Sequence, residues 1–286
     1  MTIDYDKLIN LDIPDVRQTY TSRDTLLYAL SLGLGSDPLD EDELPFVFEK
    51  DQRCLPTYGG TLTHPGFWLR DMDTGVDWVK VVHAEHRLIL HQSLPPAATV
   101  IGSHRITEVV DRGADKGAAI VWERKVRDAD SGSPLCTVIQ TMLARGDGGF
   151  GGPDVSLPSP PKTPDRAPDA YIDTPTPASM ALLYRLNGDW NPLHADPAVA
   201  GKAGFDRPIL HGLATWGVAA TAVLKKVCGF DSERIASVYG RFTVPVYPGE
   251  TLRTHMWVED KKVHYTVQVL ERDVPAIKNG LVELCA

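Results

Sequence analysis

The sequence lacks any unbroken run of about 18 apolar residues, the length that a membrane-spanning helix needs. It also lacks an excess of positive charge, because 29 lysines and arginines stand against 38 aspartates and glutamates, for a formal net charge of -9. Such a field repels phosphate groups, so we expect neither nucleic acid nor a membrane surface as a partner. The N-terminal MTIDYDKLIN contains two aspartates and predicts no secretory or mitochondrial leader.

Cysteine is scarce as well. The four cysteines lie far apart and form no C-x-x-C pair: Cys54, Cys136, Cys228 and Cys285. This spacing fits neither a zinc site nor a disulfide framework, the two structures that clustered cysteines usually indicate. Isolated cysteines are typical of reduced thiols, so we expect a cytoplasmic protein.

The chain is long enough for one large core or two smaller ones, with 286 residues of which 43% are hydrophobic. Glycines and then prolines crowd the stretch from residue 146 to 168, where no hydrophobic periodicity is present. We interpret residues 151–168 as a linker. It separates an N-terminal half, residues 1–150, from a C-terminal half, residues 169–286.

Short patterns recur in the same order in the two halves. Asp-Pro-Leu at residues 37–39 corresponds to Asn-Pro-Leu at 191–193, and LPPAATV at 94–100 corresponds to VYPGETL at 246–252. A near-constant offset at two separated places is the signature of an internal repeat. We therefore expect a duplicated domain with the same fold in both halves.

The second half predicts a sheet wrapped around one helix. Apolar residues alternate over residues 263–269, as in a half-buried strand. Apolar residues at helical spacing over 208–227 predict a long, mostly buried helix that begins at Pro208. The corresponding stretch of the first half, residues 56–75, is too rich in glycine and proline for such a helix. The predicted class is α+β, with a degraded or shortened helix in the first half.

A polar turn in the second half offers an acid and a base. Asp189 and His194 lie five residues apart in the sequence GDWNPLH, on either side of a bend. Gly188 and Pro192 are the residues that shape this bend. Asn191 is placed to orient one of the two side chains. The turn therefore predicts an acid–base pair directed toward one point.

The start of the predicted long helix provides a second element of chemistry. The first-turn amides of a helix have no intrahelical acceptor and lie at the positive end of the helix dipole. Gly212 has no side chain that would keep a ligand carbonyl away from its amide. Such an amide can stabilise an oxyanion. Together with the acid–base pair, it predicts addition or loss of water next to a carbonyl, without a cofactor.

Three other features of the sequence could be read as sites: a group of metal ligands, a histidine beside Gly212 and a glycine-rich loop. Asp189, His194, Asp196 and His211 offer metal ligands, but their spacing matches no ligand template, so no metal is expected. His211 stands next to the oxyanion glycine and favours a structural role, as a residue that holds the site in place. GDGGFGG at 146–152 lacks the lysine of a phosphate-binding loop and is read as part of the linker region.

The segments YRLNGDWNPLH and GFDRPILHGL resemble the signature of the hydratase 2 family, the MaoC-like (R)-specific enoyl-CoA hydratases. SRDTLLYALSLG, CLPTYG, GGFGG and VYPGETL also resemble the hydratase 2 unit of peroxisomal multifunctional enzymes, so the similarity covers nearly the whole chain. The resemblance implies a double hot-dog fold with two antiparallel sheets, each wrapped on a central helix. It also implies that the first half accommodates the acyl chain and that the second half holds the active site.

Carried over to this sequence, the resemblance implies that Asp189 and His194 are catalytic. It further implies a set of residues that bind the thioester, the acyl group and CoA: Trp190, Asn191, Pro192, Leu193, Gly212, Phe242, His83, Ala84, and either Arg112 or Lys116. Ala84 departs from the family, which has glycine there. Arg112 and Lys116 are equally eligible because an insertion separates them.

The activity that the resemblance implies is reversible syn hydration of trans-2-enoyl-CoA to (3R)-3-hydroxyacyl-CoA, with a medium or long acyl chain. Three alternatives stay open at this point. One is a dehydratase that acts on 3-hydroxyacyl carrier protein, another is an acyl-thioester-binding protein without turnover, and the third is a thioesterase. An acyl-CoA is the expected substrate, and association into a homodimer is expected from the fold.

Overall fold

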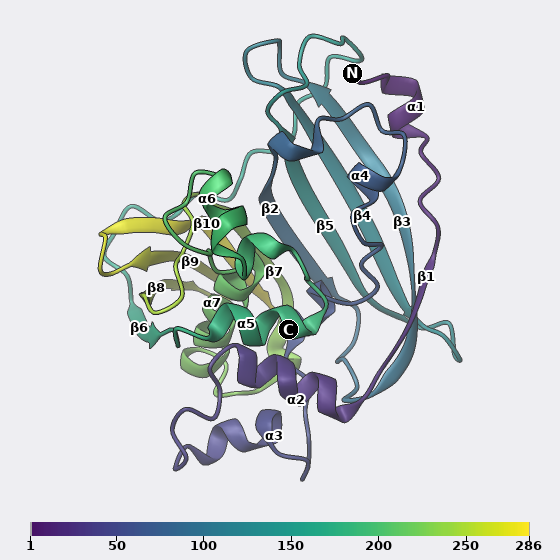
Figure 1. Cartoon of the computed structure of the whole chain (residues 1–286). Coiled ribbons are helices and arrows are strands. Elements are labelled where there is room, and N and C mark those ends of the chain that lie inside the picture. Colours follow the sequence, from purple (N-terminus) through teal and green to yellow (C-terminus); the bar gives the residue numbers. More distant parts are fainter. Residues whose placement is uncertain (1, 286) are drawn as a thin grey trace.

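The computed structural model describes residues 2–285. Its strands are long and account for most of the regular structure, and Figure 1 shows them as two groups, one in each half. They are β1 (Val16–Tyr20), β2 (Val81–Leu90), β3 (Ala98–Asp111), β4 (Ala118–Asp128), β5 (Pro134–Ala144), β6 (Ala170–Pro175), β7 (Ile235–Phe242), β8 (Thr251–Glu259), β9 (Lys262–Val269) and β10 (Val274–Leu284).

The helices are short, with two exceptions. The two longer ones are α2 (Ser22–Ser31) and α7 (Gly212–Lys226). The others are α1 (Tyr5–Ile9), α3 (Leu44–Val47), α4 (Trp68–Asp71), α5 (Met180–Tyr184) and α6 (Pro197–Lys202). Single turns of 3-10 helix are η1 (Glu41–Glu43), η2 (Pro56–Gly60), η3 (Trp78–Lys80), η4 (Arg185–Asn187), η5 (Pro192–His194) and η6 (Ser232–Arg234). Within residues 2–285, no helix has both the length and the hydrophobicity needed to cross a bilayer.

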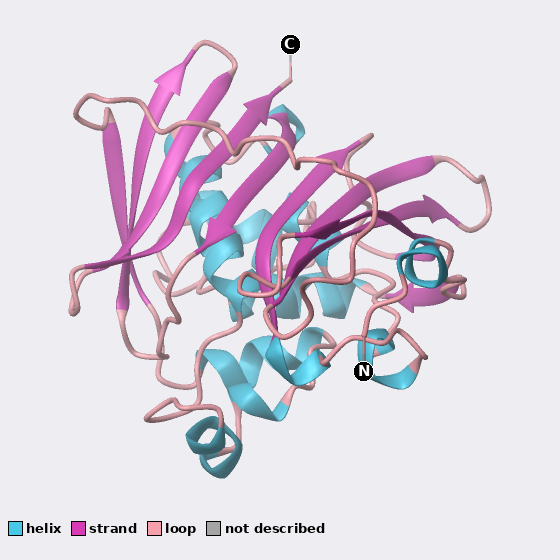
Figure 2. Cartoon of the chain, turned by 90° about the horizontal axis from the view of Figure 1, so that it is seen from above, coloured by secondary structure: helices cyan, strands magenta, loops and turns pink. Residues whose placement is uncertain are grey.

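All strands belong to one antiparallel sheet, in the order β1-β3-β4-β5-β2-β7-β10-β9-β8-β6. The first five positions hold the strands of the first half, and the last five hold those of the second half in the mirrored order. Each half therefore has the same topology, as expected from the internal repeat. The two predicted sheets are present, and β2 and β7 join them edge to edge, as the run of strands in Figure 2 shows.

The predicted central helix of the second half is confirmed as α7. It packs against strands β6 to β10, and most of its residues are buried because small and apolar side chains cover nearly its whole surface. Lys225 and Lys226 occupy its last turn, where the helix dipole favours positive charge. The predicted start at Pro208 is wrong, since the helix begins at Gly212. Residues 208–211 before it belong to no helix or strand, and the Leu210 N–H donates to the Val246 carbonyl at 2.7 Å.

The degraded helix of the first half is also confirmed. The stretch that corresponds to α7 contains only the 3-10 turn η2 and the single-turn helix α4. In Figure 1, the first-half sheet accordingly has α4 and irregular chain over the face that α7 covers in the second half. The two halves nevertheless share one core, because the main hydrophobic cluster includes Tyr28 and Leu88 from the first half and Trp216 and Val238 from the second.

Candidate active site

The turn that holds the predicted acid and base follows α5 directly. The helix continues as η4 and ends at Gly188, whose φ of 113° is a left-handed conformation that glycine adopts without strain. The chain then bends into η5, which begins at Pro192. The Asn191 side chain accepts from the Leu193 N–H at 3.0 Å and so caps η5. Glycine and proline thus shape the turn as predicted, whereas the Asn191 side chain binds its own turn.

His194 is buried and has one fixed ring nitrogen. Its Nδ1 lies 2.8 Å from the carbonyl oxygen of Ile209. Because a carbonyl only accepts hydrogen bonds, Nδ1 carries the proton and Nε2 has a free lone pair. Burial lowers the pKa of His194, although the Asp189 carboxylate opposes this effect. The imidazole is therefore neutral at pH 7 and can accept a proton through Nε2.

Asp189 is exposed, whereas His194 beside it is buried. Its carboxylate accepts from the backbone N–H of Asn191 at 3.1 Å, so Asn191 does orient Asp189, through its backbone. The backbone carbonyl of Asp189 accepts from His211 Nε2 at 3.3 Å. One donor atom from each of Asp189, His194 and His211 lies within 4.8 Å of the other two. The fold thus brings the predicted acid–base pair together.

His211 contacts both catalytic candidates, as a residue that holds the site in place would do. Its ring stacks on that of His194, with centroids 3.7 Å apart, and its centroid lies 4.9 Å from that of the Tyr184 ring. Burial is the main cause that lowers its pKa to about 4. His211 is therefore neutral at pH 7. It lies between the turn and α7, where it donates to the Asp189 carbonyl and stacks on the His194 ring. Its position directly before Gly212 was the only signal for this in the sequence.

The N-terminus of α7 offers free amides next to this cluster. Among residues 2–285, the N–H groups of Gly212 and Leu213 have no hydrogen-bond acceptor. A Cβ atom on Gly212 would lie 3.4 Å from the Phe242 ring, so this ring forms one wall beside the amide. An acceptor oxygen placed there would meet the positive end of a helix with 15 residues.

The first half contributes to the same place through β2. The rings of His83 and Phe242 lie 5.0 Å apart, although the two residues come from different halves. A bulge between His83 and Glu85 puts Ala84 out of the regular register. His83 Nε2 lies 3.1 Å from the Glu85 carbonyl, and burial lowers the pKa of this histidine to about 4. The structure thus brings His83 and Phe242 to the free amide of Gly212.

Other predicted residues lie at the surface. The Trp190 side chain is exposed, and the guanidinium of Arg185 packs over its ring at 4.7 Å. Arg112 and Lys116 both lie on the exposed turn between β3 and β4, where neither has a side-chain contact with the catalytic candidates among the described residues. Their assignment as CoA contacts stays a prediction.

Only three of the four possible metal ligands noted in the sequence lie together. Asp189, His194 and His211 are close enough to hold a divalent ion together. The fourth residue, Asp196, instead caps α6, where its carboxylate accepts from the Ala198 N–H at 2.8 Å.

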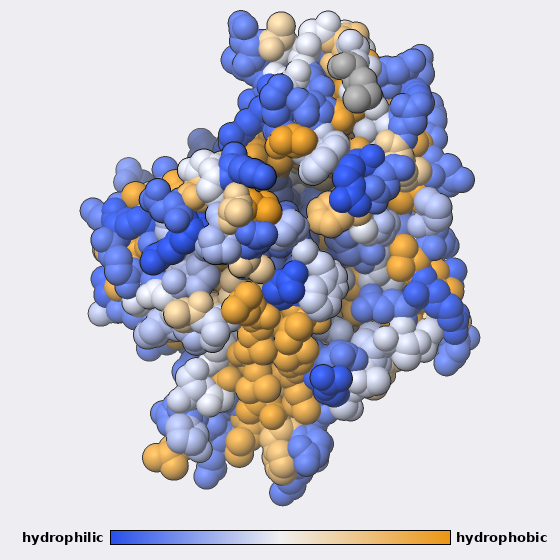
Figure 3. Space-filling view, in the orientation of Figure 1, coloured by the Kyte–Doolittle hydropathy of each residue, from blue (hydrophilic) through white to orange (hydrophobic). Residues whose placement is uncertain are grey.

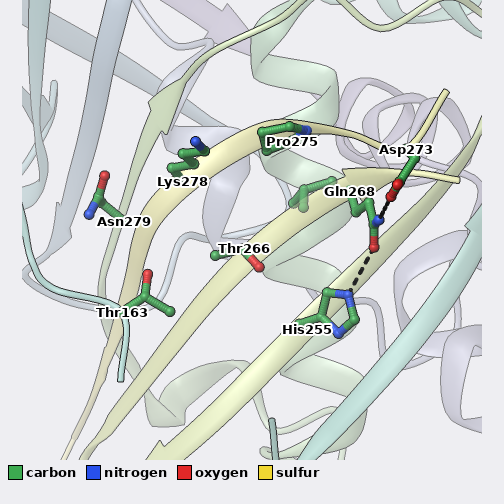
Figure 4. A pocket seen from close by; sticks show the side chains of 9 residues that line it. Thr163, His255, Thr266, Gln268, Asp273, Pro275, Lys278 and Asn279 are labelled. Atoms are coloured by element: carbon green, nitrogen blue, oxygen red, sulfur yellow. Dashed lines mark hydrogen bonds between the residues drawn. The ribbon is translucent and has the colours of Figure 1, made fainter. Parts of the chain in front are cut away.

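A cavity of about 380 Å³ lies elsewhere, on the face of β8, β9 and β10 that points away from α7. His255 and Gln268 meet there, and Gln268 also contacts Asp273, as Figure 4 shows. Lys278 and Thr163 line its other side. None of the predicted site residues lines this cavity.

Comparison with known proteins gives family matches for both halves. Residues 18–146 match the model of the MFE-2 hydratase 2 N-terminal domain, and residues 160–279 match the MaoC-like domain. The chain is 41% identical to 3-hydroxyacyl-thioester dehydratase Y of Mycobacterium tuberculosis, over 83% of this chain and 82% of that protein. It is 36% identical to the enoyl-CoA hydratase ChsH3 of the same organism, over 98% of each chain.

Among solved structures, the chain resembles a MaoC-like dehydratase from Phytophthora capsici. The two superpose with a TM-score of 0.87 and 31% sequence identity, over 98% of each chain.

Proposed function

This chain belongs to the MaoC-like hydratase 2 family, and on that premise we propose that it catalyses the reversible syn addition of water to trans-2-enoyl-CoA, giving (3R)-3-hydroxyacyl-CoA. It is thus a hydro-lyase of fatty acid metabolism. The observation that carries the proposal is that Asp189, His194 and His211 lie within 4.8 Å of one another, and that the free amide of Gly212 follows His211 directly at the start of α7.

The geometry supports the following roles. A water molecule binds between the Asp189 carboxylate and His194 Nε2, which both accept its protons. The water oxygen bonds to C3 of the enoyl group while Nε2 takes up one proton, and this proton passes to C2 on the same face. Negative charge develops on the thioester oxygen, where the Gly212 amide donates to it. The sum is one water added, with no net change at the protein.

CoA rather than a carrier protein is the proposed carrier of the acyl group. A carrier protein is acidic and would dock against a chain with a net charge of -9, which is unfavourable. The CoA phosphates need only a few local cations, such as Arg112 or Lys116. The alternative is a dehydratase for 3-hydroxyacyl carrier protein; the relative that is called a 3-hydroxyacyl-thioester dehydratase supports dehydration of a thioester in general.

We also propose a cytoplasmic location and a homodimer. The thiols support the first, because all four cysteines are free and three of them are buried. An apolar patch supports the second: Leu30, Leu182 and Leu186 are exposed on the neighbouring elements α2, α5 and η4. Figure 3 shows a broad hydrophobic region over the part of the molecule where Figure 1 labels α2 and α5. Fractionation of cells tests the location. Light scattering of the wild type and of Leu182→Glu tests the dimer, which the glutamate should dissociate.

The activity is tested by the loss of enoyl-thioester absorbance with trans-2-decenoyl-CoA, followed by chiral analysis of the product. We expect (3R)-3-hydroxydecanoyl-CoA from the wild type. Asp189→Asn and His194→Gln should each lower kcat by about 10²- to 10⁴-fold and keep the fold. His255→Gln, which replaces a histidine outside the site, is the matched control and should keep full activity. Release of free CoA would instead indicate a thioesterase.

A further inference from the structure

A buried arginine in the first half has no negative partner. The Arg124 side chain lies on the inner face of β4 and has no exposed surface. Its Nη2 donates to the Gly60 carbonyl at 2.7 Å, but Nε and Nη1 have no acceptor among residues 2–285. Burial lowers the pKa of Arg124 only to about 10, so the group stays charged at pH 7. A buried charge without a counter-ion is costly, so an acceptor from outside the chain is the expected complement.

Other unpaired polar groups surround Arg124 on the same face of the sheet. The strand register places His104 of β3 opposite Arg124, and Trp122 stands two residues away on the same strand. In the adjoining row of the sheet, Trp122 faces Gln140, which faces His86. The atoms without a hydrogen-bond partner here are both ring nitrogens of His86 and His104, Trp122 Nε1 and Gln140 Oε1.

The corresponding strand of the second half has no charged side chain on its inward face. The strand that occupies the position of β4 there is β9, and its inward residues Val263, Tyr265 and Val267 are fully buried in the core around α7. The polar face thus coincides with the half from which the long helix is missing, and η2 and the residues just after it cover it instead. His64 belongs to this cover, and its ring meets Trp122 at 5.4 Å.

The polar face is continuous with the candidate active site. Gln140 Nε2 lies 3.3 Å from His83 Nε2, and the His83 ring contacts Phe242, the wall beside the Gly212 amide. A thioester bound at Gly212 therefore has this row of polar groups beside it, with Arg124 farther into the first half. In the order of the sheet, β4 is three strands from β7, or about 14 Å at the usual strand spacing.

We propose that the acyl group of the substrate carries an oxygen acceptor far from the thioester, and that Arg124 binds it. This inference rests on the proposed hydratase function and specifies its substrate class. The acceptor is a carboxylate or a ketone at the distal end of the acyl group. The Nε and Nη1 groups of Arg124, which have no acceptor among the described residues, can donate to either, and a guanidinium pairs especially well with a carboxylate. Arg124 is thus a specificity-determining residue.

The test compares three substrates of equal length: trans-2-decenoyl-CoA, its analogue with a terminal carboxylate, and its analogue with a ketone next to the terminal carbon. We expect the wild type to have at least a 10-fold higher kcat/KM for one of the oxygenated substrates. The same comparison with octenoyl and dodecenoyl chains finds the length that reaches Arg124. Preference for the carboxylate or for the ketone identifies the acceptor.

The key variant is Arg124→Met, which removes the charge and keeps a long side chain, so that no unpaired charge is left behind. It should lose about 10- to 100-fold in kcat/KM on the preferred oxygenated substrate, mainly through KM, and lose nothing on decenoyl-CoA. Arg124→Lys should recover part of this loss. Arg127→Met replaces an exposed arginine of the same strand and is the matched control. An equal loss on all three substrates would mean a purely structural role and would overturn the proposal.

A binding measurement tests the role of Arg124 independently of the proposed hydratase activity. Calorimetric titration with the saturated acyl-CoA and its terminal carboxylate and ketone analogues needs no turnover. Tighter binding of an oxygenated ligand to the wild type, lost in Arg124→Met, supports the Arg124 subsite even if no enoyl-CoA is hydrated. Equal affinity for all three ligands in both proteins overturns it, whatever the activity.

Discussion

The single free nitrogen of His194 fixes how the activity responds to acid. Nδ1 is held by the Ile209 carbonyl, so Nε2 is the nitrogen that accepts a proton from water. Only the neutral imidazole can do so. Burial places the pKa of His194 below its ordinary value of 6.5, so the neutral form persists to lower pH than in an exposed histidine.

We therefore expect kcat/KM to stay constant from pH 8 down to about 6.5 and to fall as the pH drops further, through the lowered pKa of the free enzyme. The measurement is kcat/KM for decenoyl-CoA across this range, with buffers matched in ionic strength. A variant such as His194→Gln should lack this acid limb in its residual activity. Half-maximal activity at pH 7 or above would contradict the assignment of His194 as the base.

Glycine at position 212 is needed so that the thioester oxygen can approach the backbone amide, and it is not needed for folding. A methyl group there would meet Phe242 at ordinary contact distance, 3.4 Å, and alanine is favoured in helices. We expect Gly212→Ala to fold with a free energy of unfolding within about 1 kcal/mol of the wild type. The methyl group would displace the thioester oxygen from the amide, so kcat should fall by about 10²-fold. Urea denaturation and steady-state kinetics measure the two effects, and a fully active variant would exclude this amide as the oxyanion donor.

At the scale of elements, the packing of α7 against the sheet depends on Gly240 of β7. A Cβ atom on Gly240 of β7 would lie 2.9 Å from the Trp216 ring and 2.9 Å from the Tyr265 hydroxyl. Both rings are buried, and Trp216 is part of α7, so neither can move without disturbing the core. The close approach of helix to sheet therefore requires glycine at this position.

Gly240→Ala should lower the free energy of unfolding by about 1–3 kcal/mol, the usual cost of overpacking a core. Gly201→Ala is the control, because a Cβ on Gly201 of α6 meets nothing within 4 Å. This control should leave the stability unchanged or raise it by up to about 1 kcal/mol. Chemical denaturation measures the free energy of unfolding of both variants. Equal values would show that α7 and β7 can move apart without loss of stability.

The elements that the sequence predicted well are those that local signals define. Gly188, Pro192 and the polar residues between them form the turn as predicted, because turn geometry depends on residues that are neighbours in the chain. The long helix was also predicted, but its start was placed four residues too early, because a proline at the first helical position is a common signal. Here Pro208 belongs to no helix or strand, and Leu210, two residues later, donates to the Val246 carbonyl instead.

Contacts between distant segments could not be predicted in the same way. The sequences of β2 and β7 do not reveal that these strands pair with each other. A strand in the middle of a sheet and an edge strand that is covered by other elements carry similar residues. The stacking of His211 on His194 depends on where α7 begins. Arg124 belongs to an alternating strand, and only the pairing of β3, β4 and β5 shows that its side chain points inward without a partner.

At the scale of the whole molecule, the two halves complete each other. β2 and β7 pair from Glu85 to Ile89, so separation of the halves would expose one long edge strand in each. Lys225 at the end of α7 binds Asp40 of the first half at 2.6 Å. Asp40 of the first half corresponds in the internal repeat to His194 of the second half. The first half, which lacks the catalytic pair, therefore uses this position to bind α7 of the second half.

We therefore expect that neither half, residues 1–150 or 169–286, folds alone into a soluble monomer. Each should aggregate or self-associate through its exposed edge, and co-expression of both should restore a folded and active pair. Circular dichroism measures folding, gel filtration measures self-association, and the hydratase assay measures activity. The control is the full chain cut by a protease at a site inserted in residues 151–168, which have no helix or strand and should tolerate the cut. A half that is monomeric and melts cooperatively would show that β2 and β7 are stable as free edges.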